Sequence, residues 1–318
     1  MTTHPLCSII LPTYNGSRYL RESLDSCLNQ SYASLEVIVV DDCSTDETAE
    51  LLRSYRDPRL RTIRHDQNRQ LPAALNSGFA LAQGQYLTWT SDDNRYAPTA
   101  IATMAQLLDT THVDLVYADM RYMDRAGNLG ERAVLQEPFD PVSGHTIGAC
   151  FLYTRWLRDL CGDYDEECFL AEDFDYWIRV SQQGVMRHLP EVLYYYRRHE
   201  RSLTENHAYT CRIVATTVLV QAKHHVLTTQ AAAAAALRFL GAAHGKPPVA
   251  VRAASRLLRV LTFGRISPYE TWHAVCYAEQ RREIATVIAA YLQSALEMRE
   301  AVMQITAILA TIGDIYWW

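Results

Sequence analysis

The stretch Tyr86-Leu87-Thr88-Trp89-Thr90-Ser91-Asp92-Asp93-Asn94 joins a short apolar run to two adjacent carboxylates. The apolar part is typical of a buried β-strand, and Asp92 and Asp93 follow at its carboxyl end. Mg²⁺ and Mn²⁺ prefer carboxylate oxygens, and an ion held by one or two carboxylates can take its other ligands from a substrate diphosphate. A polar turn that closes the strand is the more common explanation of an isolated Asp-Asp pair. Other segments of the sequence are therefore needed to distinguish a turn from a metal site at Asp92 and Asp93.

Strand-like and helix-like patterns alternate on both sides of this stretch. Apolar runs at residues 6–11, 37–40 and 60–64 precede it, residues 113–118 follow it, and a helical pattern separates each neighbouring pair. Alternation of this kind predicts a parallel sheet with right-handed crossovers. We therefore expect an α/β fold with a mostly parallel sheet flanked by helices.

Polar side chains follow three of the predicted strands at their carboxyl ends. Tyr14 comes after the first strand, Asp41 and Asp42 end the second, and Asp92 and Asp93 follow the central one. Open α/β sheets bind ligands beyond the carboxyl ends of their strands, so we expect these side chains to line one crevice. The first strand is followed neither by Gly-x-Gly-x-x-Gly nor by a Walker-type Gly-Lys-Ser/Thr, which argues against a dinucleotide fold and a P-loop.

Beyond residue 119 the pattern changes. Residues 120–124 and 129–135 flank a turn-forming tetrapeptide as the strands of a hairpin do. Glu172 and Asp173 open an amphipathic helical pattern that stops at Gly184. Acidic residues in a first helical turn usually serve to interact with the positive end of the helix dipole, so this pair alone does not establish a catalytic site.

Six segments, taken in order, resemble the motifs of glycosyltransferase family 2, the inverting sugar-nucleotide enzymes with the GT-A fold. They are Ser8-Ile9-Ile10-Leu11-Pro12-Thr13-Tyr14-Asn15, Val39-Val40-Asp41-Asp42-Cys43-Ser44-Thr45-Asp46, Leu71-Pro72-Ala73-Ala74-Leu75-Asn76-Ser77-Gly78, Ser91-Asp92-Asp93, Glu172-Asp173-Phe174-Asp175-Tyr176-Trp177 and Tyr196-Arg197-Arg198-His199-Glu200-Arg201-Ser202. Each segment alone is a weak signal, whereas their ordered occurrence over residues 6–205 is specific. The resemblance favours a metal site over a simple turn at Asp92 and Asp93.

The resemblance implies a donor site built mainly by the first two motifs. Pro12, Tyr14 and Asp41 would surround the nucleotide base, with Tyr14 offering a stacking face, and Asp92 would hold the ribose. Gln70 stands where relatives commonly have Gly, which leaves the contact of that loop with the donor open.

The resemblance also implies a metal site and a general base. Asp93 would bind Mn²⁺ or Mg²⁺ on the donor diphosphate, and it would be the only carboxylate ligand because Ser91 occupies the first motif position. His199 would be a further metal ligand or a hydrogen-bond donor to phosphate, although a histidine in a basic loop is otherwise usually solvated. Asp173 would take the proton of the acceptor hydroxyl, and Glu172 would orient the acceptor or a loop.

The function implied is a metal-dependent inverting glycosyltransferase. Its donor would be a nucleoside-diphosphate sugar, with UDP favoured, and its acceptor a saccharide or lipid-linked molecule in cell-surface polysaccharide biosynthesis. Two alternatives stay open, a sugar-phosphate nucleotidyltransferase and a non-catalytic sugar-nucleotide-binding protein. The first of these should carry a Gly-rich, basic phosphate loop after the first strand, where this chain has Thr13-Tyr14-Asn15-Gly16.

Composition and charge limit the class of protein. With 49% hydrophobic and 21% charged residues, the 318-residue chain reads as globular. Residues 1–200 carry 18 Lys and Arg against 29 Asp and Glu, whereas residues 201–318 carry 12 against 7. The acidic first part argues against a nucleic-acid substrate, because phosphate backbones bind clustered cations. Arg197 and Arg198 can reach a donor phosphate or cover this acidic face.

Cysteine usage and the N-terminus point to a cytoplasmic protein. The eight cysteines form no Cys-x-x-Cys pair, and we expect them to be reduced thiols. The N-terminus lacks the basic region of a signal peptide, and no uncharged apolar run approaches the ~20 residues that span a bilayer.

Residues 206–318 are expected to form a helical domain that follows a catalytic domain of residues 1–205. The family motifs stop at this boundary and the composition becomes helical. The arginines of residues 249–263 share one helical face, and such a basic amphipathic helix can lie on an anionic surface, here the inner face of the membrane. A helical bundle that packs on the catalytic domain or pairs two subunits as a homodimer is the alternative that we favour.

Overall fold

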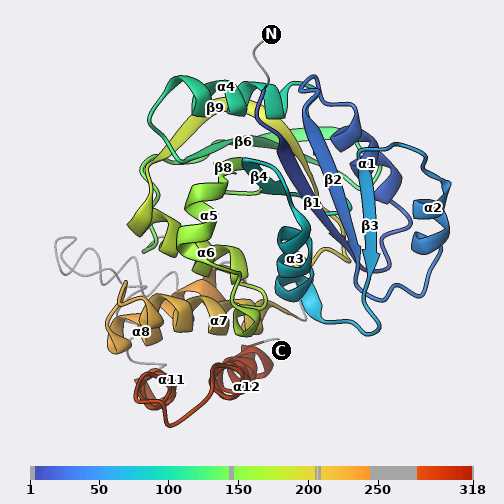
Figure 1. Ribbon diagram of the computed structural model, residues 1–318. Coiled ribbons are helices and arrows are strands. Elements are labelled where there is room, and N and C mark those ends of the chain that lie inside the picture. The colour runs from blue at the N-terminus through green and yellow to red at the C-terminus, as the bar shows by residue number, and fades with distance from the viewer. Residues whose placement is uncertain (1–3, 143–146, 205, 207–208, 244–277, 317–318) are drawn as a thin grey trace. The chain divides into compact units, whose positions relative to one another are not determined.

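The structure is a computed structural model that describes residues 4–142, 147–204, 206, 209–243 and 278–316 (Figure 1). The chain forms two compact units, residues 1–205 and residues 206–318. The basic segment 249–263, for which an amphipathic helix is expected, lies outside the described residues.

The first unit is a nine-stranded sheet flanked by helices. Its elements in chain order are β1 (Cys7–Thr13), α1 (Leu20–Leu28), β2 (Leu35–Asp41), α2 (Thr48–Ser54), β3 (Leu60–Arg64), α3 (Gln70–Leu81), β4 (Tyr86–Trp89), β5 (Arg95–Tyr96), α4 (Ala100–Thr110), β6 (Leu115–Met123), β7 (Leu129–Ala133), β8 (Phe151–Thr154), α5 (Arg155–Cys161), the short 3₁₀ helix η1 (Glu166–Cys168), α6 (Glu172–Gln183) and β9 (Met186–Arg197).

Four parallel strands form the first half of the sheet in the order β3-β2-β1-β4. Every residue of β1 and β2 is buried, as expected for strands that are covered on both faces. Successive side chains of β1 enter opposite cores, because strand side chains alternate between the two faces. Ile9 packs in the core that includes Leu24 of α1, and Ile10 packs in the core that includes Phe79 of α3. The predicted alternation of strands and helices is confirmed for this half.

The second half of the sheet is mixed, in the order β4-β8-β6-β9-β5. β8 runs antiparallel to both β4 and β6, β6 and β9 are parallel, and β5 pairs antiparallel with β9. The sequence patterns did not indicate β8, because its four residues run directly into α5 and make too short an apolar run. The predicted hairpin is confirmed in β6 and β7, although β6 is one continuous strand. The mostly parallel arrangement therefore describes only the half from β3 to β4.

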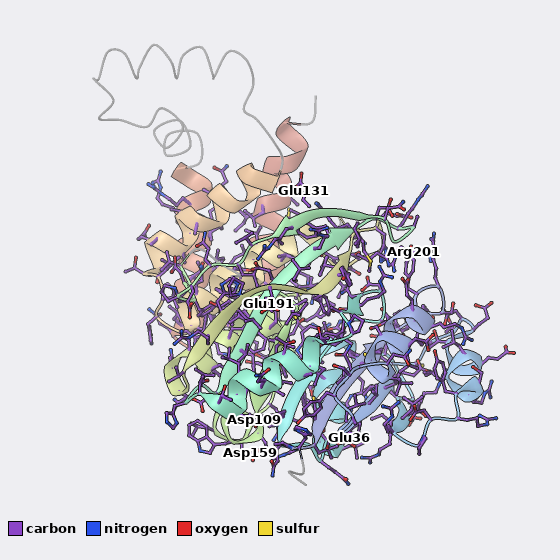
Figure 2. All side chains as sticks on the ribbon, turned by 90° about the horizontal axis from the view of Figure 1, so that it is seen from above. Glu36, Asp109, Glu131, Asp159, Glu191 and Arg201 are labelled. Atoms are coloured by element: carbon purple, nitrogen blue, oxygen red, sulfur yellow. The ribbon has the colours of Figure 1, made fainter. Side chains whose placement is uncertain are left out.

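The amino-terminal edge of the sheet holds carboxylates that have structural partners. Glu36 accepts hydrogen bonds from the Ser8 hydroxyl at 2.6 Å and from the Gln83 N–H at 2.7 Å. Asp109 of α4 accepts one from the Tyr86 hydroxyl. Figure 2 shows Glu36 and Asp109 toward one end of the first unit. These acidic groups belong to the packing and contrast with the carboxylates at the opposite edge.

The described part of the second unit consists of α7 (Thr210–Lys223), α8 (Thr229–Ala243), α11 (Ala278–Leu292) and α12 (Met298–Tyr316). Helix α7 packs against α8 and α12, α8 packs against α11, and α11 packs against α12. Each helix contributes buried apolar side chains, among them Val218, Ala233, Ile288 and Ile305. Among the helices that the structure describes, none has both the length and the apolar character needed to cross a bilayer.

Candidate active site

The carboxyl ends of β1, β2 and β4 meet because these strands are neighbours in the sheet. Thr13 pairs with Asp41 across β1 and β2. The N–H of Thr90 donates to the Ile10 carbonyl oxygen at 2.9 Å, so the segment after β4 lies beside the end of β1. The Thr13 hydroxyl donates a hydrogen bond of 2.5 Å to Asp92 Oδ2. Polar side chains from three strands therefore converge at this edge.

Asp92 is closely enclosed by its surroundings. A Cβ atom at Gly16 would lie 2.0 Å from Asp92 Oδ2, so only glycine leaves room for the carboxylate. Burial, followed by the negative charge of Asp93, raises the pKa of Asp92 to about 7, and the hydrogen bond from Thr13 opposes this shift. Because neighbouring carboxylates repel each other, a cation at this position would favour the ionised form of both.

The three residues expected around a nucleotide base differ in how firmly they are held. Pro12 is a buried residue of β1, whereas Tyr14 is 51% exposed and leaves a ring face free for stacking. Asp41 is buried, and its Oδ2 accepts a hydrogen bond of 2.6 Å from Arg64. Its Oδ1 accepts the N–H of Ser44 at 2.8 Å. Asp41 is therefore fixed before any ligand binds, while Tyr14 is open.

Arg64 is a residue of this edge that the sequence patterns missed. It ends β3 and lies opposite Asp41 in the register of β2 and β3. Its guanidinium also donates to the Ser44 carbonyl oxygen at 2.7 Å. A cavity of about 340 Å³ is lined by Arg64, His65, Asp66, Gln67 and Arg69. The sequence signal that could have identified Arg64 is its position at the carboxyl end of a predicted strand, next to a strand that ends in Asp41.

Asp42 orders the loop that leads into α3. Its carboxylate accepts hydrogen bonds from the N–H groups of Arg69 and Gln70, each at 2.8 Å, and lies 2.7 Å from His65 Nδ1. Gln70 has a φ of 70°, in the left-handed region that favours glycine. The hydrogen bond to Asp42 thus holds a glutamine in a conformation that a glycine would adopt readily.

The loops that carry the candidate residues contain further strained backbone. Asn15 has a φ of 55°, Cys43 a φ of 68° and Leu170 a φ of 78°. Non-glycine residues in this region are uncommon and concentrate at functional sites. Together with Gln70, they border the candidate residues after β1, after β2 and before α6.

Asp93 and His199 are brought together although they lie far apart in the sequence. His199 Nε2 is 2.9 Å from Asp93 Oδ2. The N–H of Arg201 donates to His199 Nδ1 at 3.2 Å, so the neutral ring carries its proton on Nε2 and donates it to Asp93. In this arrangement His199 orients the carboxylate. Direct ligation by Nε2 requires the ring to give up that hydrogen bond.

The second oxygen of Asp93 provides the test of a metal site. Asp93 Oδ1 is buried and has no hydrogen-bond partner among the described residues. Leaving a buried polar atom unpaired costs about 1–3 kcal/mol, which a ligand at this oxygen would offset. A hard carboxylate oxygen with a histidine beside it suits Mg²⁺ or Mn²⁺. The residues at the end of β4 therefore fit a divalent cation.

Glu172 and Asp173 lie in the first turn of α6, and their surroundings differ. Glu172 is buried, and its Oε2 accepts the N–H of Leu170 at 2.7 Å. Burial, followed by the charge of Asp173, raises the pKa of Glu172 to about 8. Glu172 therefore holds the strained loop before α6 and keeps its proton near neutral pH. Asp173 is partly exposed, and its Oδ1 accepts the N–H of Phe174 at 2.7 Å.

One buried tyrosine connects the start of α6 to β4. The hydroxyl of Tyr164 accepts a hydrogen bond from the Trp89 indole N–H at 2.9 Å. The pKa of Tyr164 is raised, chiefly by burial and then by the neighbouring Tyr176, with a smaller effect from Asp173. Trp89 ends β4, the strand that leads to Asp93. Tyr164 therefore lies near Asp173 of α6 and is hydrogen-bonded to β4, the strand that leads to Asp93.

A second group of potential metal ligands lies in η1 and α6. Ligand atoms of Asp165, Cys168 and Asp175 are all within 4.8 Å of one another. Asp175 Oδ2 accepts a hydrogen bond of 2.9 Å from Arg179, and Asp165 Oδ1 accepts the N–H of Glu167 at 2.9 Å. Both carboxylates thus have structural partners, unlike Asp93 Oδ1.

Comparison with known sequences gives consistent matches. Residues 8–171 match the family model described as glycosyl transferase family 2. An uncharacterised glycosyltransferase of Rickettsia typhi is 31% identical over 216 residues, which are 64% of this chain and 67% of the relative. Chondroitin synthase of Escherichia coli is 30% identical over 199 residues, which are 60% of this chain and 28% of that enzyme. The chain thus spans about two thirds of the first relative and under a third of the second.

Comparison with solved structures confirms the predicted GT-A fold. Residues 1–349 of Staphylococcus aureus TarS, in complex with UDP-GlcNAc, match with a TM-score of 0.60 and 17% identity over 98% of this chain and 93% of that one. The mannosyltransferase PcManGT of Pyrobaculum calidifontis, in complex with GDP-Man and Mn²⁺, matches with a TM-score of 0.57 and 20% identity over 99% and 88%.

Proposed function

Because the chain belongs to glycosyl transferase family 2, we propose that it is a metal-dependent inverting enzyme that transfers a sugar from a nucleoside-diphosphate sugar to a saccharide or lipid-linked acceptor. The unpaired, buried Oδ1 of Asp93 beside His199 is the observation that carries the proposal. UDP is the favoured nucleotide of the donor. Structural neighbours solved with UDP-GlcNAc and with GDP-Man and Mn²⁺ support a nucleotide-sugar donor.

On the donor side, the residues at the ends of β1, β2 and β4 bind the nucleotide. Pro12 and Asp41 border the base, and the exposed ring of Tyr14 stacks on it. Asp92, oriented by the Thr13 hydroxyl, accepts a hydrogen bond from the ribose. The ion pair with Arg64 holds Asp41 in place, so this carboxylate is already oriented before the donor arrives.

At the diphosphate, Asp93 would hold Mn²⁺ or Mg²⁺ through Oδ1, with His199 as a further ligand or as the group that orients Oδ2. A bound cation neutralises the negative charge that develops on the departing diphosphate. Adjacent negative charge from Asp92 strengthens the attraction of this edge for a cation.

On the acceptor side, Asp173 acts as the general base. The acceptor oxygen forms its bond to the anomeric carbon while the bond to the diphosphate oxygen breaks, and the hydroxyl proton moves to the Asp173 carboxylate. General-base catalysis of this kind contributes roughly 10²–10⁴-fold. One displacement inverts the anomeric configuration. Glu172, protonated near neutral pH and bonded to Leu170, positions the loop before α6.

We place the reaction in cell-surface polysaccharide biosynthesis on the cytoplasmic side of the membrane. The 30% identity to chondroitin synthase supports a polysaccharide-building role. Residues 206–318 would act as a separate helical domain that packs on the catalytic domain, pairs two subunits or contacts the membrane surface.

Transfer assays with the full chain and a panel of UDP- and GDP-linked sugars test this function. Asp93→Asn should lower metal-dependent turnover by roughly 10²-fold or more, because metal stabilisation of the leaving group is worth several kcal/mol. Asp159→Asn, which changes an exposed carboxylate of α5, is the matched control and should leave turnover unchanged. Undiminished turnover by Asp93→Asn, or turnover that ignores chelation of the metal, would contradict the proposal.

A further inference from the structure

Arg197 is one of the largest fully buried side chains of the molecule, although arginine is rarely buried in full. Its side chain is 1% exposed. Nε donates to the carbonyl oxygen of Asp93 at 2.8 Å, and one terminal nitrogen donates to Glu22 Oε2 at 2.5 Å. The other terminal nitrogen donates to the carbonyl oxygens of Asp124 and Arg125 at 3.2 and 3.4 Å. One guanidinium thus joins α1, the segment after β4 and the turn between β6 and β7.

The backbone of Arg197 is tied to the same segment. Its N–H donates to Asn94 Oδ1 at 2.7 Å. The guanidinium also lies over the Tyr19 ring, 4.4 Å from the centroid, and the His199 ring is 5.1 Å from the Tyr19 ring. His199 follows Arg197 by two residues, and its Nε2 lies 2.9 Å from Asp93 Oδ2. A shift of Arg197 would therefore move both groups of the candidate metal site.

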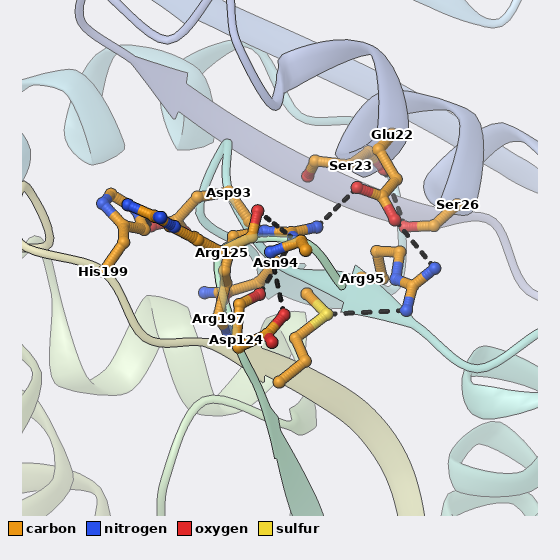
Figure 3. A network of polar contacts seen from close by, with 12 residues as sticks. Glu22, Ser23, Ser26, Asp93, Asn94, Arg95, Asp124, Arg125, Arg197 and His199 are labelled. Atoms are coloured by element: carbon orange, nitrogen blue, oxygen red, sulfur yellow. Dashed lines mark hydrogen bonds and ion pairs between the residues drawn. The ribbon is translucent and has the colours of Figure 1, made fainter. Parts of the chain in front are cut away.

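The choice of acceptor atoms is informative. Arg197 donates to the main-chain oxygen of Asp93 and not to its carboxylate (Figure 3). Of the two carboxylate oxygens, Oδ2 is bonded to His199 and Oδ1 has no partner among the described residues. An arginine bonded directly to that carboxylate would compete with a cation for it. The backbone of Asp93 is therefore fixed by Arg197, and Oδ1 of the carboxylate keeps its hydrogen-bonding capacity for a ligand.

Glu22 supplies the counter-charge to this buried cation. Its Oε2 accepts from Arg197, and its Oε1 lies 2.7 Å from Arg95. Arg197 is buried whereas the Glu22 side chain is 40% exposed, so loss of Glu22 would leave the buried guanidinium without its counter-charge. Figure 3 shows Glu22 between Arg95 and the Arg197 side of the network. The neighbouring Ser23 hydroxyl donates to the Ser91 carbonyl oxygen at 2.8 Å, so α1 holds the same loop at a second point.

We propose that Arg197, balanced by Glu22, is a positioning residue for the divalent cation: it fixes Asp93 and His199 relative to each other so that Asp93 Oδ1 is presented to the ion. The inference rests on the proposed metal site. Lysine cannot replace Arg197, because its three donors share one nitrogen, whereas the guanidinium reaches Asp93, Glu22 and the turn at Asp124 in one plane.

The test measures metal linkage rather than turnover. Calorimetry on the full chain gives the affinity for UDP, or for GDP if the wild type binds it better, with Mn²⁺ and with a chelator. Arg197→Lys should lower the Mn²⁺-dependent gain in nucleotide affinity by roughly 10–100-fold, as is typical for partners of metal ligands. Its metal-free nucleotide affinity should stay within about twofold of the wild type, because the hydrogen bonds and the ion pair of Arg197 go to Glu22, Asp93, Asn94 and the turn at Asp124 and not to the residues expected around the base.

Two further variants separate the outcomes. Arg187→Lys makes the same chemical change at an exposed position of the same strand, β9, where the guanidinium is paired with Glu137, and should keep the full Mn²⁺-dependent gain in nucleotide affinity. Glu22→Gln should also lower the Mn²⁺-dependent gain in nucleotide affinity. It tests the positioning role if Arg197→Lys does not fold. A wild-type gain that both Arg197→Lys and Glu22→Gln retain overturns the positioning role alone. A wild type with no Mn²⁺-dependent gain overturns the proposed metal site and the inference with it.

Discussion

His199 Nε2 lies 2.9 Å from Asp93 Oδ2, while Oδ1 of the same carboxylate is buried and unpaired among the described residues. This asymmetry separates Asp93 from the structural carboxylates of the first unit, such as Glu36 and Asp42, whose hydrogen bonds are supplied by the protein. The N–H of Arg201 donates to His199 Nδ1, which leaves Nε2 of the neutral ring to donate to Asp93, so the geometry favours an orienting role for His199.

The orientation role of His199 can be separated from direct ligation. His199→Ala should raise the Mn²⁺ concentration needed for half-maximal activity by roughly 10–100-fold, as loss of an orienting partner does. His199→Gln should recover most of this loss, because its amide N–H can donate to Asp93 Oδ2 without acting as an imidazole ligand. Equal losses in the two variants would instead assign the ring to direct ligation.

Asp173→Asn should lower kcat by roughly 10²–10⁴-fold and leave donor KM unchanged, because the amide cannot accept the acceptor proton. Asp175→Asn is a contrast from the same helix, since Asp175 is buried and paired with Arg179. It should lower the melting temperature more than kcat. Steady-state kinetics and thermal unfolding of both variants check this, and an Asp173→Asn enzyme with wild-type kcat would remove the general base.

Glu172 should make stability depend on pH. Its pKa is about 8 in the folded protein and about 4.5 in the unfolded chain, so between these values the folded state holds the extra proton. The free energy of unfolding should therefore fall as pH rises through this window, by at most about 1.4 kcal/mol per pH unit from this group. Below pH 4.5 its contribution is fully present, and above pH 8 it is lost.

Urea unfolding at several pH values between 5 and 8 measures this effect. Glu172→Gln should flatten the fall relative to the wild type, because the amide does not titrate. Asp92 contributes in the same direction, so only the difference between the two proteins reports on Glu172. Identical slopes would show that Glu172 is already ionised in the folded protein.

Gly16 should tolerate no side chain. The Cβ of Gly16→Ala would lie 2.0 Å from Asp92 Oδ2 and 2.5 Å from Thr13 Oγ1, and the resulting displacement should destabilise the protein by about 1–3 kcal/mol and weaken nucleotide binding. At Gly130 the nearest atom is 3.6 Å away, so Gly130→Ala should stay within about 0.5 kcal/mol of the wild type. Denaturant unfolding and calorimetry compare the two, and equal stability of both variants would mean that Asp92 can move aside.

The first half of the fold could be read from the sequence because each strand there is a distinct apolar run followed by a helical pattern. β8 could not, since a four-residue strand that continues into α5 has no periodicity of its own. The helix boundaries also shifted slightly, as in α3, which begins at Gln70 rather than at the proline two residues later. The N–H of Gln70 is bonded to Asp42 and its φ of 70° is left-handed, so regular helical geometry begins after this residue.

The candidate site also has a part that the sequence predicted and a part that it did not. Strand ends place Asp41, Asp92 and Asp93 at one edge, and this follows from sheet topology alone. The approach of His199 to Asp93 depends on the pairing of β5, which follows Asp93, with the end of β9, and only the family resemblance indicated it. Arg197 was interpreted as a surface or phosphate-contacting cation, because nothing in a Tyr-Arg-Arg-His sequence reveals that one guanidinium is buried and its neighbour exposed.

Anomalous diffraction from crystals soaked with Mn²⁺ and UDP tests the central claim most directly. A manganese peak within coordination distance of Asp93 Oδ1, at about 2.0–2.2 Å, is the predicted result, with nucleotide density beside Tyr14 and Asp41. A peak at Asp165, Cys168 and Asp175 with none at Asp93, or nucleotide bound with no metal beside Asp93, would contradict the account.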